Sequence, residues 1–126
     1  MAVPILKQGQ YLIASIQDVL TDADLQQLRD ALLAQVGRHR SRGVIVDITA
    51  LDVMDSFAVR TVRDIAHMTR LRGAETVIVG MQPEVALSVA QLGLTLEGVH
   101  AALDLEEGLA FLDKKANAAR GGRPGG

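Results

Sequence analysis

The sequence predicts an α/β fold: one domain with a mixed, mostly parallel sheet, an N-terminal hairpin and about four helices largely on one face. The chain has 126 residues, of which 48% are hydrophobic, enough for one buried core. Apolar runs of strand length alternate with segments of helical period, which requires crossover connections and therefore parallel strands. Two short strand-like runs at the start are separated by a glycine-containing turn, which is typical of an antiparallel hairpin.

The hairpin comes first and a helix follows it. Residues 3–6 and 11–16 have the composition of strands, and residues 7–10 between them form the predicted turn. Thr21 precedes two aspartates, as an N-cap residue does at the start of a helix. Apolar residues then recur at helical spacing, at Leu25, Leu28, Leu32 and Val36.

The central part of the chain predicts a buried strand and an amphipathic helix. Residues 44–48 form a nearly continuous apolar run, as expected of a strand that is covered on both faces. A helix is expected to start near Ser56 and to end at Gly73. Its apolar face would contain Ala58, Val62, Ile65 and Thr69, and its polar face Arg60, Arg63, Asp64, His67 and Arg70.

Two further strands and a helix complete the sheet. Residues 76–79 form a strand-like run, and a short strand is expected near residues 99–100. Between them, Pro83 suits the first turn of a helix and Gly93 suits its end. Active and binding sites of such sheets lie where strands end and helices begin. Ser56 and the loop 80–83 are both predicted to lie at such ends.

A last helix and a tail end the chain. Asp104 is the predicted N-cap, with Glu107 three residues further on, and the helix is expected to reach about Ala116. The tail is rich in glycine, arginine and proline, which favours a frayed conformation. We therefore expect the folded domain to span residues 1–117 and a flexible tail to span residues 118–126.

The composition excludes several classes of function. The chain has no cysteine, so disulfides, thiol catalysis and thiolate metal sites are absent. A formal net charge of -2 and only 2% aromatic residues give no basis for nucleic-acid binding. No signal peptide is evident, and no apolar run approaches the ~20 residues that a membrane span needs. We expect a cytoplasmic protein without nucleic-acid or membrane partners.

Hydrolytic chemistry at Ser56 would need a nearby base, and the candidates are His39, His67 and His100. His67 would lie ~16 Å away along the same helix, at 1.5 Å per residue. The nucleophile elbow G-x-S-x-G is missing around the serine. The sequence therefore argues against a serine hydrolase, and we expect no enzymatic activity.

Metal and cofactor sites have equally little support. Asp47, Asp52 and Asp55 lie near one another in sequence, so a weak Mg²⁺ site is conceivable. The favoured interpretation is that Asp47 binds loop backbone and Asp55 favours the N-terminus of the next helix. The phosphate-binding motifs G-x-x-x-x-G-K-[ST] and G-x-G-x-x-G are missing. No cofactor and no metal ion are expected.

Two serines are candidates for modification. Ser56 lies at a predicted helix N-terminus, where a phosphate would meet unpaired N–H groups and a partial positive charge. The alternative is an ordinary N-cap serine. Ser88 is a weaker candidate, because it lies within the predicted third helix and a partly packed serine is the simpler interpretation.

The residues around Ser56 are candidates for binding a partner. Met54, Phe57 and Met81 flank the predicted loop ends and would form an adaptable apolar contact if exposed, or simply core if buried. Asp55 and Arg60 lie beside the serine. Arg60, Arg63 and Arg70 would form either a solvated helix face or a rim that recognises an acidic partner.

Several stretches together resemble a known family. The chain is similar from about residue 3 to residue 112 to the RsbS family, the small STAS-domain scaffold proteins of the bacterial stressosome. An Asp-Ser pair at the start of the second helix is shared across anti-sigma factor antagonists. The stretches that carry the resemblance are 4–7 (PILK), 15–17 (SIQ), 43–49 (GVIVDIT), 54–57 (MDSF), 80–83 (GMQP) and 102–109 (ALDLEEGL).

The resemblance implies a function. Proteins of this family co-assemble with RsbR-like STAS proteins into a hollow shell that holds an RsbT-like serine kinase, and an RsbX-like phosphatase resets the system. Self-association is implied as well. Ser56 matches the phosphorylated serine of the family, and Ser88 matches a position where RsbR-type proteins carry a phosphorylatable threonine.

One departure and two alternatives complete the comparison. Direct antagonists such as SpoIIAA typically follow the serine with glycine, whereas Phe57 and Ala58 follow it here, which favours the scaffold interpretation. The first alternative is a stand-alone antagonist that binds an anti-sigma kinase directly. The second is a small-ligand or nucleotide-binding domain.

Overall fold

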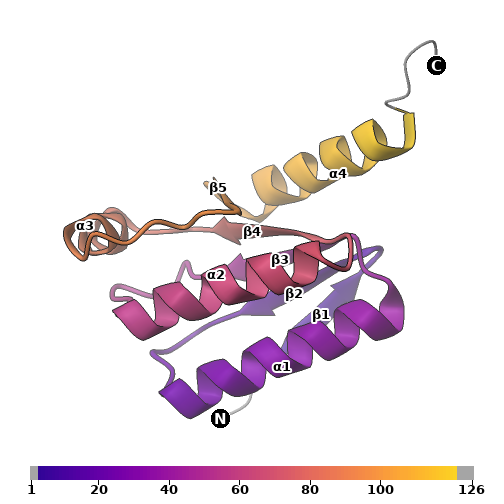
Figure 1. Ribbon diagram of the computed structural model, residues 1–126. Coiled ribbons are helices and arrows are strands. Elements are labelled where there is room, and N and C mark those ends of the chain that lie inside the picture. Colours follow the sequence, from indigo (N-terminus) through magenta and orange to yellow (C-terminus); the bar gives the residue numbers. More distant parts are fainter. Residues whose placement is uncertain (1–2, 122–126) are drawn as a thin grey trace.

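A computed structural model describes residues 3–121 and contains the predicted alternation of strands and helices (Figure 1). The chain begins with the hairpin and then alternates helix and strand through to a long last helix. The elements are β1 (Ile5–Gln8), β2 (Tyr11–Ser15), α1 (Asp22–His39), β3 (Gly43–Asp47), α2 (Ser56–Arg70), β4 (Glu75–Val79), α3 (Pro83–Gln91), β5 (Val99–Ala102) and α4 (Leu105–Gly121). The predicted fold class is confirmed.

The five strands form one sheet in the order β1-β2-β3-β4-β5. β1 pairs antiparallel with β2, and every later pair is parallel. The register places Ser15 beside Asp47, and Asp47 beside Val79. The carboxyl ends of β2, β3 and β4 therefore lie level, and the loops that follow them meet at one edge of the sheet.

Helices cover both faces of the sheet. On one face α1, α2 and α3 pack against a cluster that includes Val44, Val46 and Ile78. On the other face α4 packs through Leu112 against a smaller cluster with Ile45 and other residues of β2, β4 and β5. Figure 1 shows α1 and α2 side by side and α4 apart from them, across the sheet. β3 is thus buried on both faces, which explains its continuous apolar run.

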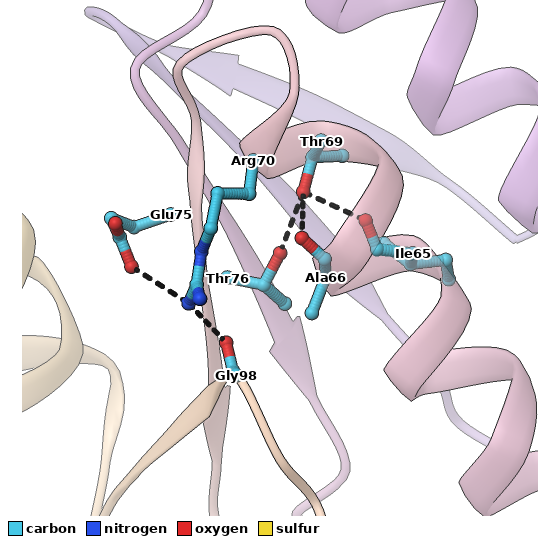
Figure 2. Close-up of polar contacts among 7 residues, drawn as sticks. All are labelled: Ile65, Ala66, Thr69, Arg70, Glu75, Thr76 and Gly98. Carbon is cyan, nitrogen blue, oxygen red and sulfur yellow. Dashed lines mark hydrogen bonds and ion pairs between the residues drawn. The ribbon is translucent and has the colours of Figure 1, made fainter.

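A buried polar contact fixes the C-terminal end of α2 to β4 (Figure 2). The Thr69 hydroxyl is 2.7 Å from the carbonyl oxygen of Ile65 and 3.0 Å from the Thr76 hydroxyl. One residue further, the Arg70 guanidinium donates to the carbonyl oxygen of Gly98 at 2.9 Å. These contacts hold the C-terminal end of α2 against β4 and against the residue that precedes β5.

The last helix extends beyond its predicted end. α4 continues past Ala116 to Gly121, while residues 122–126 lie outside the described residues. The alanine-rich stretch after Lys115 accounts for the extension, because alanine is the best helix former. The boundary at residue 117 stays a prediction. Within residues 3–121, no helix is long and apolar enough to cross a membrane.

Candidate functional site

Ser56 is the first residue of α2 and lies at the edge of the sheet where the loops meet. Asp55 is the N-cap: its carboxylate accepts a hydrogen bond from the backbone N–H of Ala58 at 2.8 Å. The alternative in which Ser56 itself caps the helix is therefore wrong, because the preceding carboxylate occupies that role. The two residues of the Asp-Ser pair therefore differ in role. The aspartate caps the helix, and the serine is not needed for capping.

The Ser56 side chain is partly exposed. Among residues 3–121, no group forms a hydrogen bond with its hydroxyl. The hydroxyl lies at the positive end of a 15-residue helix, where negative charge is favoured. The arrangement suits a serine that accepts a phosphate, because its hydroxyl contributes little to the stability of the fold.

The loop before Ser56 is fixed near its start, at Thr49. The Asp47 carboxylate accepts from the Thr49 backbone N–H at 2.9 Å and from its hydroxyl at 2.6 Å. From the next loop, the Gln82 side-chain amide donates to the Thr49 carbonyl oxygen at 2.8 Å. Gly80, with a φ of +76°, packs so closely that an added Cβ would lie 2.9 Å from the Thr49 Cα. Neither Gln82 nor Gly80 carries a sequence signal for this contact.

An apolar groove lies beside the N-terminus of α2. It holds about 100 Å³ between the β2–α1 and β3–α2 loops, and Asp55 lies on its wall. Val19 and Val53 line it with 64% and 47% of their surfaces exposed. Its other lining residues are Ile16, Leu20, Leu25, Leu51, Met54, Ala58 and Val62.

The predicted partner-binding residues fall into three groups by exposure. Asp55 and Arg60 are exposed, and Phe57 and Met81 are partly buried. Met54 is only 4% exposed, so of its two interpretations the core residue applies, although it also lines the groove. Val19, which lies outside the predicted set, is far more accessible.

Two of the three arginines on α2 bind the backbone of this domain. Arg63 donates to the carbonyl oxygen of Thr95 at 3.3 Å, and Arg70 donates to that of Gly98. Both carbonyls belong to the loop between α3 and β5. Arg63 and Arg70 thus also hold this loop, although the Arg70 side chain is 52% exposed. Whether these arginines and Arg60 form a solvated face or a rim that recognises an acidic partner stays a prediction.

Ser88, the second candidate, is partly buried on α3. α3 begins at Pro83, one residue after Gln82. Because Gln82 is bonded to Thr49, the helix that carries Ser88 is tied to the loop that leads to Ser56. One side-chain hydrogen bond thus joins the start of the helix that carries Ser88 to the start of the loop that leads to Ser56.

The histidines do not gather around Ser56. His67 lies on the same continuous helix, at ~16 Å by helical rise. His39 ends α1, at the opposite end from the loop edge, and His100 stacks on Phe111 with ring centroids 3.7 Å apart. In the described part of the chain, no three His, Asp or Glu side chains come together as a possible metal site. Asp47 and Asp55 instead bind backbone, as the favoured interpretation of these aspartates predicted.

Comparison with known proteins identifies relatives of the whole domain. A serine-to-glutamate variant of Moorella thermoacetica RsbS is 34% identical, with a TM-score of 0.80 over 91% of this chain and 97% of that one. A chain of a solved stressosome, described as a signal integration and transduction hub, is 35% identical, with a TM-score of 0.77 over 90% of this chain and 98% of that one. SpoIIAA in its unphosphorylated form is 15% identical with a TM-score of 0.66, which shows a shared fold alone.

Curated relatives are longer than this chain. The RsbT co-antagonist protein RsbRA of Bacillus subtilis is 31% identical over 84 residues, which are 67% of this chain and 31% of RsbRA. RsbRD of the same organism is 28% identical over 64% of this chain and 29% of its own length. The chain thus spans less than a third of the length of these two relatives.

The family itself follows from a match over most of the chain. The family model of the STAS domain matches residues 2–107, which include the hairpin, all five strands and the first turn of α4. The structural relatives extend the likeness over about nine-tenths of the chain. Because this match covers most of the chain, the chain belongs to the STAS domain family.

Proposed function

We propose that this chain is a non-enzymatic scaffold of a cytoplasmic stressosome. It co-assembles with RsbR-like STAS proteins, holds an RsbT-like serine kinase, and releases that kinase when Ser56 is phosphorylated. An RsbX-like phosphatase removes the phosphate and resets the scaffold. Ser88 is a secondary candidate site.

The observation that carries the proposal is the state of the Ser56 side chain. It is partly exposed at the first position of α2, and among the described residues its hydroxyl has no hydrogen-bond partner. A kinase acting there would break no internal contact. Asp55 keeps the helix capped whether or not the serine is modified.

Phosphorylation would change the surface more than the fold. A phosphate adds about -1.5 to -2 charge at neutral pH. The positive end of α2 favours that charge, whereas the Asp55 carboxylate opposes it. Because the preceding loop is fixed through Thr49, we expect the backbone to stay in place and the bound partner to meet a new, hydrated charge.

The relatives support the partners in this proposal. RsbRA is named as a co-antagonist of RsbT, and a stressosome chain is similar to this chain over most of its length. The RsbS structure carries glutamate in place of a serine, a substitution that introduces a negative charge. A scaffold that switches through charge at a serine fits all three.

The test combines phosphorylation with assembly. The purified chain is incubated with an RsbT-like kinase and ATP, and mass spectrometry locates the phosphate. We expect it on Ser56, and we expect the chain to form a megadalton-scale particle with an RsbR-like protein. Ser56→Ala should assemble and bind the kinase normally but fail to release it, while the matched variant Ser88→Ala should release it.

Three outcomes would overturn the proposal. The first is a phosphate that lies only elsewhere in the chain. The second is normal kinase release from Ser56→Ala. The third is a monomer that binds an anti-sigma kinase directly and never co-assembles, which would favour the stand-alone antagonist.

A further inference from the structure

Three arginines surround one open depression at the end of the domain opposite to Ser56. Figure 1 shows α1 and α2 running alongside each other in the same direction, so the segments that follow them lie at the same end. Arg40 and Arg42 come from the segment after α1, and Arg72 comes from the segment after α2. The depression holds about 570 Å³, and none of its lining residues is acidic. Its other lining residues are Val36, Gly37, Ser41 and Gly73.

The three guanidinium groups have no internal partner. Among residues 3–121, no hydrogen bond or ion pair includes the side chain of Arg40, Arg42 or Arg72. The acid nearest to Arg72 in sequence is Glu75, and its carboxylate pairs with Arg70 at 3.5 Å. Three positive charges that repel one another are therefore held around one space, without a negative charge inside it to balance them.

Ser41 lies between two of these arginines and adds a hydroxyl to the depression. The residue is 3% exposed and lines the depression. Its backbone N–H donates to the Val36 carbonyl oxygen at 3.2 Å, whereas its hydroxyl has no partner among residues 3–121. The described residues contain no fully enclosed side-chain oxygen without a partner, so the Ser41 oxygen reaches the space of the depression. A polar group that is buried to this degree normally has a hydrogen-bond partner.

The backbone of Arg40 is left-handed, with a φ of 50° and a ψ of 45°. Among residues 3–121 it is the one residue other than glycine with a positive φ. Helices commonly end with a residue in this conformation, and that residue is usually glycine because it has no Cβ to clash. An arginine at this position is strained relative to glycine, so the end of α1 does not by itself explain its presence.

Gly37 allows the Arg72 guanidinium to approach α1. A Cβ added to Gly37 would lie 2.7 Å from Nη1 of Arg72, too close for both to stay in place. Glycine within a helix is less favourable than alanine, so its use here has a cost in stability. Arg40 and Gly37 are therefore both disfavoured by the backbone around them, and both determine where a guanidinium lies.

Helix dipoles account for part of this positive charge but not for its arrangement. Cations are favoured at helix C-termini, which explains Arg38 and His39 in the last turn of α1. The same effect explains neither an unpaired buried hydroxyl nor an arginine where glycine would end the helix more easily. Three full charges also exceed the partial negative charge of about half a unit at each helix end.

We propose that this depression binds a diphosphate group. Guanidinium groups donate paired hydrogen bonds to phosphate oxygens, and the Ser41 hydroxyl donates one more. One phosphate carries about -1.5 to -2 charge at neutral pH, so two linked phosphates balance three arginines better than one does. The depression also has the size of a small-molecule site, for which roughly 300–1,000 Å³ is usual.

The site is separate from Ser56 and does not rest on the proposed function. Ser56 begins α2 and Arg72 follows its end, so the 15 residues of the helix separate them by ~22 Å at 1.5 Å per residue. The same chemistry suits a free diphosphate and the diphosphate group of an ester. The experiments below distinguish these two sources.

Isothermal titration calorimetry of the full chain with inorganic pyrophosphate tests the proposal. The buffer contains no phosphate and no magnesium, and its ionic strength is low. We expect binding that saturates at one pyrophosphate per chain. Added sodium chloride should weaken the binding, because the charged groups are partly exposed to solvent. Absence of saturable binding at low salt would overturn the proposal.

Three substitutions and a matched control test the residues of the site. Arg42→Gln, Arg72→Gln and Ser41→Ala should each lower the affinity for pyrophosphate about tenfold, the scale of one hydrogen bond to a charged group. The control, Arg38→Gln, removes the same charge from the last turn of α1 but lies outside the depression. It should change the affinity far less. Equal losses in Arg38→Gln and Arg42→Gln would show a diffuse attraction of charge and would refute the site.

Two further substitutions separate binding from folding. Arg40→Gly and Gly37→Ala each introduce the residue that the local backbone favours, so the melting temperature should stay the same or rise. Arg40→Gly removes a guanidinium, and Gly37→Ala displaces that of Arg72. Both should therefore weaken the binding of pyrophosphate. A lower melting temperature, or an unchanged affinity in both variants, would contradict the roles assigned to Arg40 and Arg72.

A parallel titration with ADP identifies the source of the diphosphate. ADP that binds as tightly as pyrophosphate, and loses affinity in Arg42→Gln, indicates the diphosphate group of an ester. Failure of ADP to bind where pyrophosphate binds indicates free diphosphate. A hexaglutamate peptide should bind far more weakly than either. Equally tight binding of the peptide would overturn the proposal, because the surface would then recognise negative charge alone.

Discussion

The side-chain amide of Gln82 donates a hydrogen bond to the backbone carbonyl oxygen of Thr49 at 2.8 Å. Gln82 is the N-cap residue of α3, yet its side chain forms no capping bond to its own helix. It binds instead the loop that leads to Ser56. The bond makes the position of that loop depend on α3.

Gln82→Ala should therefore loosen the loop before Ser56. We expect a loss of about 1 kcal/mol in unfolding free energy, the usual contribution of one hydrogen bond. Hydrogen exchange should rise in residues 49–56, and KM for phosphorylation by an RsbT-like kinase should rise more than kcat falls. Gln91→Ala, at an exposed position of the same helix, is the control and should change neither quantity.

Thr69 and Thr76 should behave as a coupled pair. Thr69→Val removes a partner from the buried Thr76 hydroxyl, and leaving a buried hydroxyl unpaired costs about 1–3 kcal/mol. Thr69→Val/Thr76→Val removes both hydroxyls and should recover part of that loss. Urea unfolding of the two single variants and the double variant measures the coupling; strictly additive losses would contradict it.

Two substitutions of Asp55 should separate the contribution of its capping hydrogen bond from that of its negative charge. Asp55→Ala removes the N-cap of α2 and should cost about 1 kcal/mol. Asp55→Asn keeps an oxygen that can accept the Ala58 N–H, so its melting temperature should stay close to that of the unmodified chain. Equal destabilisation by both substitutions would show that the charge, rather than the cap, is what α2 needs.

Ser56→Asp should weaken binding of the RsbT-like kinase while the domain remains folded. The carboxylate carries less charge than a phosphate, so the effect should be smaller than that of phosphorylation itself. Isothermal titration calorimetry should compare the affinity of the kinase for Ser56→Asp and for Ser56→Asn. The two side chains have nearly the same size, so a difference in affinity reports the effect of charge. Unchanged affinity for Ser56→Asp would argue against an electrostatic switch.

Local signals predicted the elements well. Thr21 caps α1 in a full capping box with Asp24, and Asp104 accepts from the Glu107 N–H at the start of α4, as the sequence indicated. The same signals were ambiguous by one residue at α2, because Asp55 and Ser56 are both good capping residues. Only the geometry separates them.

Contacts between distant segments could not be predicted in this way. The sequence placed Ser56 and the loop 80–83 at neighbouring strand ends, but nothing in it indicated the bond between Gln82 and Thr49. Arg63 and Arg70 have the spacing of a solvated helix face, yet each reaches a carbonyl about 30 residues away along the chain. The groove likewise required the folded positions of two loops.

Tyr11 gives this domain an optical property that follows from its packing. It is the single tyrosine of a chain without tryptophan, it is 9% exposed on the α4 side of the sheet, and its hydroxyl donates to Asp113 of α4. Its fluorescence therefore reports on the junction between β2 and the last helix, and hardly at all on the layer that carries Ser56. Detachment of α4 can thus be followed by intrinsic emission, without a label, while circular dichroism records the molecule as a whole.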